Sequence, residues 1–281
     1  MSVPHRVCIC GQSIASVRDS EHDMHIRVLG AHNIETVNTR LASVLIDDLI
    51  ALDAGSLSSS LTLEQQKALA AIFITHWHFD HTKDLPLLGL ATAGASVTHV
   101  YALTEVLSFI ADHLLDGRIY PRLFESPSPD RPSLLPHAIE PLKPVRVLDK
   151  YTVKAIPVNH GAQPSVGYEV ACDGGESVFY TGDTGPGLTA CWQHTTPRLL
   201  LIETTLPDNM EKKAIQSGHL TPRLLENELA AFLRLKGYLP SIAVVHHDPA
   251  YEEAIVQGLI AAASRLNADI RLAGDGMELE V

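Results

Sequence analysis

Short runs of apolar, β-favouring residues recur along the chain, and most of them are followed by a polar loop. Runs of this length, alternating or continuous, predict strands. The first two, 24–30 and 41–55, end in glycine and predict the antiparallel start of a sheet. The remaining predicted strands lie at 71–75, 95–102, 151–161, 165–185, 198–205, 241–249 and in the final residues after 266.

Helical periodicity appears between several of these strands. The segment 61–70 opens with Thr62 and has Gln65 three residues on, which is the pattern of a capping box. Thr221 followed by Pro222 predicts the N-cap and the first position of an amphipathic helix. The predicted helices are 61–70, 83–94, 103–117, 221–237 and 251–266.

Strands and helices recur in both halves of the chain, without a dividing linker or a short repeat. This pattern predicts one layered α/β domain over residues 24–281, with 1–23 as an N-terminal extension. The proline-rich segment 119–144 is incompatible with a regular helix or an interior strand. We interpret it either as a surface connection or as a lid over a substrate site.

Composition narrows the class of protein. With 281 residues, 46% of them hydrophobic, the chain can bury a sizeable core. The formal net charge of −12 at pH 7 argues against a sequence-independent grip on a nucleic-acid backbone, which needs clustered Lys and Arg. The first residues lack an apolar signal core, and no run of about eighteen apolar residues predicts a membrane span. We therefore expect a cytoplasmic protein.

The four cysteines do not form a secreted disulfide framework in a chain of this length. We interpret them as reduced thiols. A metal at the Cys8-x-Cys10 pair is the alternative, although no second Cys or His pair follows at the spacing of a zinc finger. The cysteines are Cys8, Cys10, Cys172 and Cys191.

The loop "ITHWHFDHTKD", residues 74–84, is dense in metal-ligating side chains and directly follows an apolar strand. His76 and His78 are separated by one residue and can face one point, while Asp80 and His81 can face an adjacent point. Titratable groups beside a buried strand are costly without a partner, and a divalent cation supplies one. The loop therefore predicts two neighbouring cation sites.

More ligands are needed, and three candidates lie just past other apolar runs: His160, Asp183 and His246. Each alone is weak, because a single His or Asp in such a loop is commonly a turn residue. Together they complete two sites on the predicted edge. The sites are His76, His78 and His160 for one ion and Asp80, His81 and His246 for the other, with Asp183 able to bridge.

The motifs "THWHFDH", "NHG", "TGDTG" and "HHDP", in this order, are similar to those of the metallo-β-lactamase superfamily. The resemblance covers roughly residues 24–281. It implies a four-layer αββα sandwich with a one- or two-metal site at one edge of the sheets, and it implies that the seven residues above are the ligands. The flavodiiron branch has Glu in place of the second histidine, so His78 keeps the hydrolytic form and disfavours redox chemistry.

Mixed imidazole and carboxylate ligands suit Zn²⁺ best, although Fe or Mn also fit. Two divalent ions about 3.5–4 Å apart can hold a hydroxide between them, because metal binding lowers the pKa of water toward about 7. This bridging hydroxide is the expected nucleophile, so neither Ser nor Cys is required. We expect Asp80 also to orient it or to accept its proton.

Glu203 in "IETT" and His219 in "GHLTP" are the candidates for protonating the leaving group. In tRNA 3′-processing endonucleases and class II cyclic-nucleotide phosphodiesterases of the superfamily, a similar element carries a histidine near the scissile phosphate. The ribonucleases pair it with the Glu of a His-Glu-Ala-Thr segment, from which this chain departs at Ile202 and Thr204. A histidine held by a carboxylate can donate to a departing alkoxide. The alternative is that His219 only caps the following helix.

The predicted function is hydrolysis of a small phosphodiester, and a 3′,5′-cyclic nucleotide fits best, since "GHLTP" and the segment 43–61 resemble the cyclic-nucleotide enzymes more closely. The basic arm that grips RNA in the tRNA enzymes is not evident. The alternatives are a tRNA 3′-end endonuclease, a lactone, thioester or carboxyl-ester hydrolase, and a non-catalytic metal- or nucleotide-binding sensor. Membrane and nucleic-acid partners are not expected. Whether the protein forms a homodimer, as is common in the superfamily, stays open.

Adjacent strand residues face opposite sides, so we expect only one of His246 and His247 to reach the metals. His246 is favoured because the ligand in the superfamily lies three residues before a proline, here Pro249. Asp53 either supports the metal loop or makes a turn. The histidines interpreted as structural or surface residues are His99, His113, His137 and His194.

Overall fold

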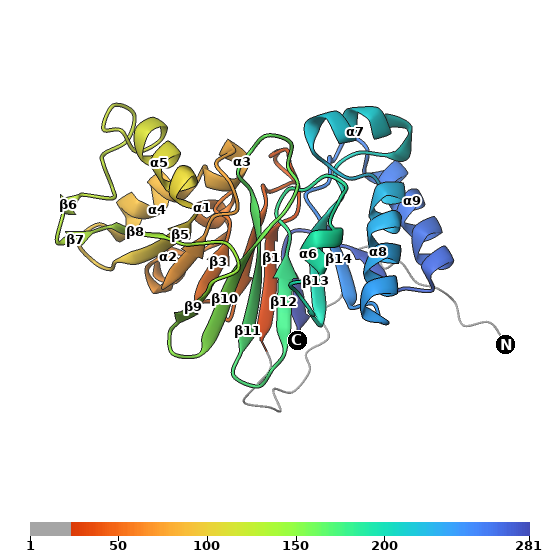
Figure 1. Ribbon diagram of the computed structural model, residues 1–281. Coiled ribbons are helices and arrows are strands. Elements are labelled where there is room, and N and C mark those ends of the chain that lie inside the picture. Colours follow the sequence, from red (N-terminus) through yellow and green to blue (C-terminus); the bar gives the residue numbers. More distant parts are fainter. Residues whose placement is uncertain (1–23) are drawn as a thin grey trace.

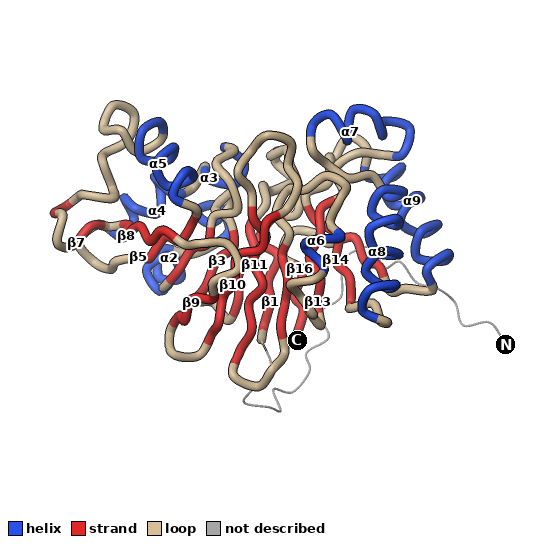
Figure 2. Tube along the Cα trace, in the orientation of Figure 1, coloured by secondary structure: helices blue, strands red, loops and turns tan. Residues whose placement is uncertain are grey.

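The structure, a computed structural model, describes residues 24–281. Two mixed β-sheets pack face to face with helices on their outer sides, which gives the four layers of an αββα sandwich (Figure 1). The trace in Figure 2 shows strands in the middle and helices on both flanks. The expected fold is therefore confirmed. The interpretations of 1–23 and of the Cys8-x-Cys10 pair concern residues outside the described range.

The first sheet has seven strands in the order β16-β1-β2-β3-β4-β5-β8. Its opening strands β1, β2 and β3 pair antiparallel, as predicted, and β3, β4, β5 and β8 run parallel. The bounds are β1 His25–Gly30, β2 Ser43–Ile46, β3 Ile50–Leu52, β4 Ala71–Phe73, β5 Thr98–Ala102, β8 Leu134–Ala138 and β16 Met277–Glu280.

The second sheet also has seven strands, in the order β15-β14-β13-β12-β11-β10-β9. The strands from β9 to β12 pair antiparallel, and those from β12 to β15 pair parallel. The bounds are β9 Pro144–Val147, β10 Tyr151–Pro157, β11 Val166–Cys172, β12 Ser177–Tyr180, β13 Leu199–Glu203, β14 Ser241–Val245 and β15 Ile270–Leu272.

Helices α1, α2, α4 and α5 lie on the flank of the first sheet, and α6, α8 and α9 on the flank of the second (Figure 1). The bounds are α1 Leu57–Ser60, α2 Leu63–Ala68, α3 Phe79–Thr82, α4 Leu85–Thr92, α5 Thr104–His113, α6 Thr189–Trp192, η1 Asp208–Met210, α7 Glu211–Ser217, α8 Pro222–Lys236 and α9 Glu252–Leu266. No helix within 24–281 is long and apolar enough to cross a bilayer.

Both predicted helix starts are confirmed. At α2 the Gln65 N–H donates to Thr62 Oγ1 at 3.2 Å, and the Thr62 N–H donates to Gln65 Oε1 at 2.9 Å, which completes the capping box. At α8 the Thr221 side chain accepts from the Leu224 N–H, and Pro222 occupies the first helical position. These side chains satisfy N–H groups that the first helical turn leaves without a partner.

Two buried clusters hold the layers together. One joins the inner faces of the sheets, where Phe73 of β4 meets Tyr168 of β11 edge-on with ring centroids 5.2 Å apart. The other lies between the second sheet and its helices, where Trp192 of α6 packs against Phe232 of α8. The second sheet is therefore buried on both faces, which explains its continuous apolar strands.

The proline-rich segment is more regular than a surface connection. Residues 119–144 contain the small hairpin of β6 (Pro127–Ser128) and β7 (Arg131–Pro132), and then β8, an edge strand of the first sheet. An edge strand accommodates Pro136 because one side of its backbone needs no donor. The hairpin lies at the outer end of the first sheet in Figure 1. A lid role stays a prediction.

The carboxyl ends of several strands meet at one edge of the sandwich. In the second sheet β10, β12, β13 and β14 all point the same way, and polar loops follow each of them. The loop 74–84 follows β4 of the first sheet and comes together with those loops. Parallel strands therefore bring residues far apart in sequence to one place.

Candidate metal centre

The loop after β4 starts in the core and ends as the short helix α3. Thr75 and His76 are fully buried, and His78 precedes the first residue of α3. Asp80 and His81 lie in the first turn of that helix. One continuous segment thus presents four of the predicted ligands from a fixed backbone.

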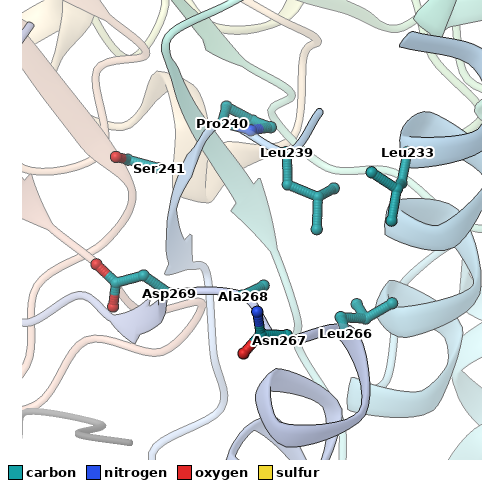
Figure 3. Close-up of a pocket in the computed structure, with 8 residues that line it drawn as sticks. All are labelled: Leu233, Leu239, Pro240, Ser241, Leu266, Asn267, Ala268 and Asp269. Atoms are coloured by element: carbon teal, nitrogen blue, oxygen red, sulfur yellow. The ribbon is translucent and has the colours of Figure 1, made fainter. Parts of the chain in front are cut away.

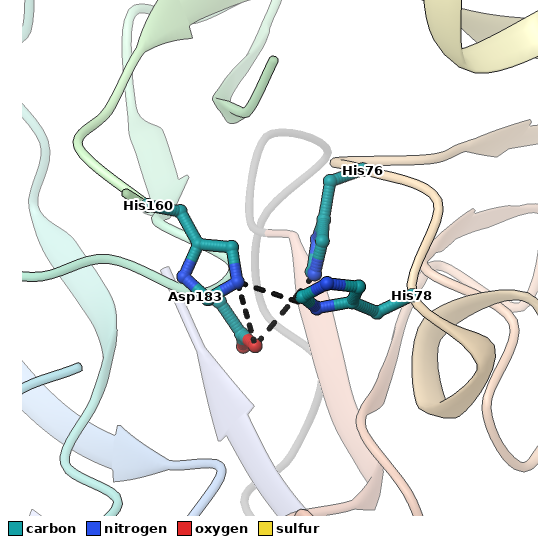
Figure 4. A group of neighbouring side chains, drawn as sticks. All are labelled: His76, His78, His160 and Asp183. Carbon is teal, nitrogen blue, oxygen red and sulfur yellow. Dashed lines mark hydrogen bonds and ion pairs between the residues drawn. The ribbon is translucent and has the colours of Figure 1, made fainter. Parts of the chain in front are cut away.

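Four predicted ligands come together at a first position: His76, His78, His160 and Asp183 (Figure 4). One ligand atom from each lies within 4.8 Å of the others. The Nε2 atoms of His76 and His160 lie 3.7 and 3.9 Å from Asp183 Oδ2. His78 turns its Nδ1 toward His160 Nε2, at 3.3 Å. These atoms fit the donor set of one cation.

A second position is formed by Asp80, His81, His246 and again Asp183. His246 Nε2 lies 3.1 Å from Asp80 Oδ2 and 3.2 Å from Asp183 Oδ1. His81 Nε2 lies 3.1 Å from Asp183 Oδ1. The two oxygens of Asp183 therefore face different ligand groups, Oδ2 the first and Oδ1 the second. This is the geometry expected of a bridging carboxylate.

Hydrogen bonds fix the orientation of the imidazoles. Thr75 Oγ1 donates to Asp53, so it accepts from His76 Nδ1 at 3.0 Å. His81 Nδ1 donates to Asp53 Oδ2 at 2.7 Å. His160 Nδ1 donates to the Gly218 carbonyl at 2.9 Å. Each bond holds the proton on Nδ1 and leaves the Nε2 lone pair free for a cation.

His246 is held in the same way by a residue that the sequence did not single out. Its Nδ1 lies 3.0 Å from Thr205 Oγ1, which itself donates to Glu203 Oε2 at 2.8 Å. The backbone of His246 is left-handed, with φ of 57°, so the residue is not part of β14. The alternation of adjacent strand residues therefore does not explain why it faces the site. The left-handed turn after the strand does.

The buried ligand atoms lack partners of their own. His76 Nε2, His81 Nε2 and Asp183 Oδ1 are enclosed and make no hydrogen bond. Orphaned polar atoms of this kind are rare in folded proteins and cost free energy. Imidazole and carboxylate donors at this spacing fit a pair of divalent cations, and Zn²⁺ is one of the ions that they suit. The residues present therefore fit a dinuclear metal site.

The shifted pKa values of these residues agree with a site whose electrostatic field attracts cations. Burial, assisted by the neighbouring His81, holds the pKa of His76 well below its usual range, which keeps that ring neutral. Burial opposes ionisation of Asp183, but His246 and His81 hold its pKa well below the ordinary carboxyl value. Burial also disfavours a charged His81, yet Asp183 and Asp53 raise its pKa well above 6.5. The negative electrostatic field that attracts a proton to His81 also attracts a divalent cation.

Glu203 and His219 contact each other directly and lie next to this donor set. His219 Nδ1 donates to Glu203 Oε1 at 2.7 Å. Glu203 is fully buried at the end of β13 and also accepts from the backbone N–H groups of Thr184 and Leu220. The His219 ring lies 5.1 Å from the His160 ring and is 16% exposed. Because Thr221 is the N-cap of α8, His219 does not cap that helix.

Burial lowers the pKa of His219, but the charge and hydrogen bond of Glu203 outweigh it, and the pKa rises to about 9. The ring is therefore an imidazolium at neutral pH, with Nε2–H directed away from Glu203. The positive charge of bound cations would bring this pKa down toward neutrality. His219 is therefore a histidine that a buried carboxylate holds at the edge of the metal centre.

The other histidines lie elsewhere. His247 belongs to a separate group with the buried His32 and the partly exposed Glu252. His99 and His137 share a hydrogen bond of 2.7 Å and stack on Tyr101 in the first sheet. His113 packs on Phe109 of α5, and His194 follows α6. Cys191 is a buried free thiol.

Sequence reasoning missed the residues that hold the ligands. Thr75 and Thr205 each lie two residues past the end of a strand, β4 and β13, and Tyr180 at the end of β12 donates to Asp53 Oδ2 at 2.9 Å. The only available signal was their position next to the motifs. Asp53 itself, left open between support and turn, does both: it binds His81 and adopts φ of 62°.

The pocket in Figure 3 lies away from this centre. It is lined by the ends of α8 and α9 and the start of β14, among them Leu233, Leu239 and Asn267. It contains none of the metal-ligating residues. The metal centre is defined by its donor groups.

Comparison with known proteins gives the class. Residues 43–247 match the family described as the beta-lactamase superfamily domain. This match covers most of the chain, and the ligand groups lie where the fold brings its strand ends together. The chain belongs to the metallo-β-lactamase superfamily, and it is a metal-dependent hydrolase of that superfamily. The comparison with curated proteins found no match.

Solved structures agree on the fold at low sequence identity. Yeast PDE1 is 18% identical with a TM-score of 0.79, over 92% of this chain and 100% of that one. The metallo-β-lactamase fold protein YhfI from Bacillus subtilis is 17% identical with a TM-score of 0.73, over 92% and 100%. Human tRNase Z, short form, is 19% identical with a TM-score of 0.67, over 91% and 98%.

Proposed function

We propose that this metallohydrolase is a phosphodiesterase and that its substrate is a small phosphodiester, best a 3′,5′-cyclic nucleotide. The observation that carries the proposal is the His219–Glu203 pair beside the dinuclear donor set. Hydrolysis of a phosphodiester with an alkoxide leaving group needs a proton donor at that oxygen. We assign this role to His219, which lies 2.7 Å from the buried carboxylate of Glu203.

The metal ligands and His219 have different roles in the proposed reaction. When bound, the cations supply Lewis acidity toward the phosphoryl oxygens and acidify water. Asp80, at 3.1 Å from His246, is placed to orient that water and to accept its proton. As the oxygen of the water bonds to phosphorus and the P–O bond to the ribose breaks, His219 gives its Nε2 proton to the departing ribose oxygen, while Glu203 holds the ring in place. No Ser or Cys nucleophile is involved.

Charge and surface favour a small substrate. The net charge of −12 opposes a long polyanion, whereas a single phosphodiester can be held by the cations. Phe79 lies between His78 and Asp80 in the chain and is 63% exposed. An exposed aromatic ring next to a metal centre offers a stacking surface for one nucleobase.

The alternatives differ in what they require. A tRNA 3′-end endonuclease uses the same acid but binds a far larger anion. A lactone, thioester or carboxyl-ester hydrolase uses the same metals and has no need of His219. A metal-binding sensor without catalysis would need Asp80 only as a ligand and would not need His219. The likeness to tRNase Z lies in the fold, at 19% identity, and so does not favour RNA.

The His219→Ala variant tests the proposed acid. Its turnover of cyclic AMP should fall by about 10²–10⁴-fold. Its turnover of bis-p-nitrophenyl phosphate should fall far less, because p-nitrophenolate leaves without protonation. Metal content should equal that of wild type, since His219 is not a ligand, and His113→Ala serves as the matched control. Equal losses on both substrates would contradict a role as acid.

A further inference from the structure

We propose that His32, His247 and Glu252 form a third metal site, distinct from the dinuclear centre and suited to Zn²⁺. The three residues come from separate segments: His32 follows β1, His247 follows β14 and Glu252 begins α9. One ligand atom from each lies within 4.8 Å of the others. Two imidazoles and one carboxylate are a common zinc donor set.

The spacing is that of ligands around one ion. Glu252 Oε2 lies 3.8 Å from His32 Nε2 and 3.6 Å from His247 Nε2, both too long for hydrogen bonds. Two ligands with zinc bonds of about 2.0–2.1 Å stand roughly 3.4 Å apart at a tetrahedral ion. In the dinuclear centre the corresponding separation of His81 and Asp80 is 3.6 Å. The third group thus matches a ligand set in the same protein.

A carboxylate orients His32 in the manner of a metal ligand. His32 Nδ1 lies 3.1 Å from Asp275 Oδ1, which also accepts from the Ala31 N–H at 2.9 Å. Asp275 Oδ2 accepts from the Arg40 N–H at 2.7 Å. The proton of His32 is therefore held on Nδ1, and Nε2 faces Glu252 and His247 with its lone pair. Metal-ligating imidazoles carry such a partner on the other nitrogen.

The burial of His247 is a second observation that supports the metal site. His247 is 1% exposed, its Nδ1 has no hydrogen-bond partner, and its Nε2 meets Glu252 beyond hydrogen-bond distance. An ion pair between a charged His32 and Glu252 would leave the buried His247 ring without a role. A cation shared by the three engages one ring nitrogen of each histidine and the carboxylate of Glu252. Glu252 is 45% exposed, so the site is open to metal and water from the solvent.

The site would brace the loop that carries His246. The His247 N–H donates to the Ala31 carbonyl at 3.1 Å, and His32 and His247 form an isolated β-bridge. His246 is held in a left-handed conformation directly before this bridge. An ion at His247 ties three segments together and so opposes relaxation of that backbone. Its role is structural and independent of which substrate is hydrolysed.

Zinc content tests the site without any activity assay. Wild type, Glu252→Gln and the neighbouring Glu253→Gln are saturated with Zn²⁺, freed of excess and measured by mass spectrometry of the metal. Glu252→Gln should hold one equivalent fewer than wild type, and Glu253→Gln should match wild type. Glutamine keeps the side-chain volume, and circular dichroism checks that the variant is folded. Identical zinc content in all three proteins would overturn the proposal.

Asp183→Asn separates this site from the dinuclear centre. That variant should lose zinc from the centre and keep one equivalent, and adding Glu252→Gln should remove it. His32→Asn in the same background should give the same loss. Zinc that survives both second substitutions would also overturn the proposal. Because all these variants lack the bridging ligand, the result does not depend on the proposed phosphodiesterase activity.

Discussion

Asp53 is a buried carboxylate that reaches the metal centre through His81. Its Oδ2 accepts from His81 Nδ1 at 2.7 Å and from the Tyr180 hydroxyl at 2.9 Å, and its Oδ1 accepts from the Thr75 N–H at 2.8 Å. These bonds join the metal loop of the first sheet to the end of β12 in the second. The negative charge makes the His81 imidazole a better donor to a cation.

Asp53→Asn should weaken zinc binding by about 10–100-fold, the usual effect of losing a carboxylate behind a histidine ligand. Asn tolerates the left-handed backbone, so the loop should keep its conformation. Competition with a chelator measures the affinity. Tyr180→Phe removes one donor and leaves the charge, so its effect should be smaller. An unchanged zinc affinity in Asp53→Asn would show that His81 needs no support.

At this scale the sequence pointed to the residues that come together at the metal centre and to Asp53 as one possible support, but it missed the supporting hydroxyl groups. His160, Asp183 and His246 could be found because each follows an apolar run, and the superfamily motifs place ligands there. Thr75 and Thr205 could not, because a hydroxyl beside a strand carries no periodic signal and is common in turns. The left-handed backbone of His246 was equally hidden, since an isolated φ above zero leaves no mark in a non-glycine residue.

The capping box of α2 is an element whose energy can be measured alone. Thr62 and Gln65 exchange two hydrogen bonds at the start of a helix on the flank of the first sheet. Thr62→Ala should lower the free energy of unfolding by about 1 kcal/mol and leave activity unchanged. Urea unfolding measures the change. Gln65→Ala, which breaks only the reciprocal bond, should cost less, and the prediction fails if Thr62→Ala unfolds at the wild-type urea concentration.

Long periodic elements were predictable and short ones were not. α8 and α9 each show an amphipathic pattern over 15 residues, so their existence followed from the sequence. α3, α6 and α7 span 4, 4 and 7 residues, too few for a hydrophobic period to be recognised. The strand β8 was not predicted, because its segment is rich in proline. Proline is tolerated in an edge strand, but which strand lies at an edge depends on neighbours that only the fold supplies.

At the scale of the whole molecule, Asp47 ties the two sheets together at the edge opposite the metal centre. It lies in the turn between β2 and β3, where its Oδ1 accepts from the His25 N–H at 2.8 Å. Its Oδ2 meets Lys150 Nζ at 2.8 Å and the hydroxyl of Tyr151 in the second sheet. Burial raises the pKa of Asp47, but Lys150 and Tyr151 outweigh it and the pKa is lowered below 3.8.

This contact predicts a pH-dependent contribution to stability. A carboxylate with a lowered pKa stabilises the folded state above its unfolded pKa, and the stabilisation is lost as the pH falls through its folded pKa. Asp47→Asn should therefore be less stable than wild type near neutral pH, by on the order of 1 kcal/mol. The difference should shrink as the pH falls below the ordinary carboxyl pKa and vanish below the lowered pKa of the folded state. Urea unfolding of both proteins across this range measures it, and a difference independent of pH would contradict the charge-based account.

The global arrangement was predictable only through the superfamily motifs. Periodicity gave strands and helices, but the pairing of β16 with β1, at opposite ends of the described chain, has no local signal. The motifs supplied the sandwich, because the same order of ligands implies the same fold, but this pairing was not predicted. What they leave open is the substrate, since one metal centre serves several hydrolases on this fold.

The most direct measurement is a substrate panel on wild-type protein of known metal content. It compares 3′,5′-cyclic nucleotides, a lactone and a tRNA precursor, with a metal-stripped sample and the Asp183→Asn variant as controls. The account predicts that a cyclic nucleotide is opened to a nucleoside monophosphate with the highest kcat/KM, and that both controls are inactive. Hydrolysis of the lactone or the tRNA precursor in preference to every cyclic nucleotide would contradict it.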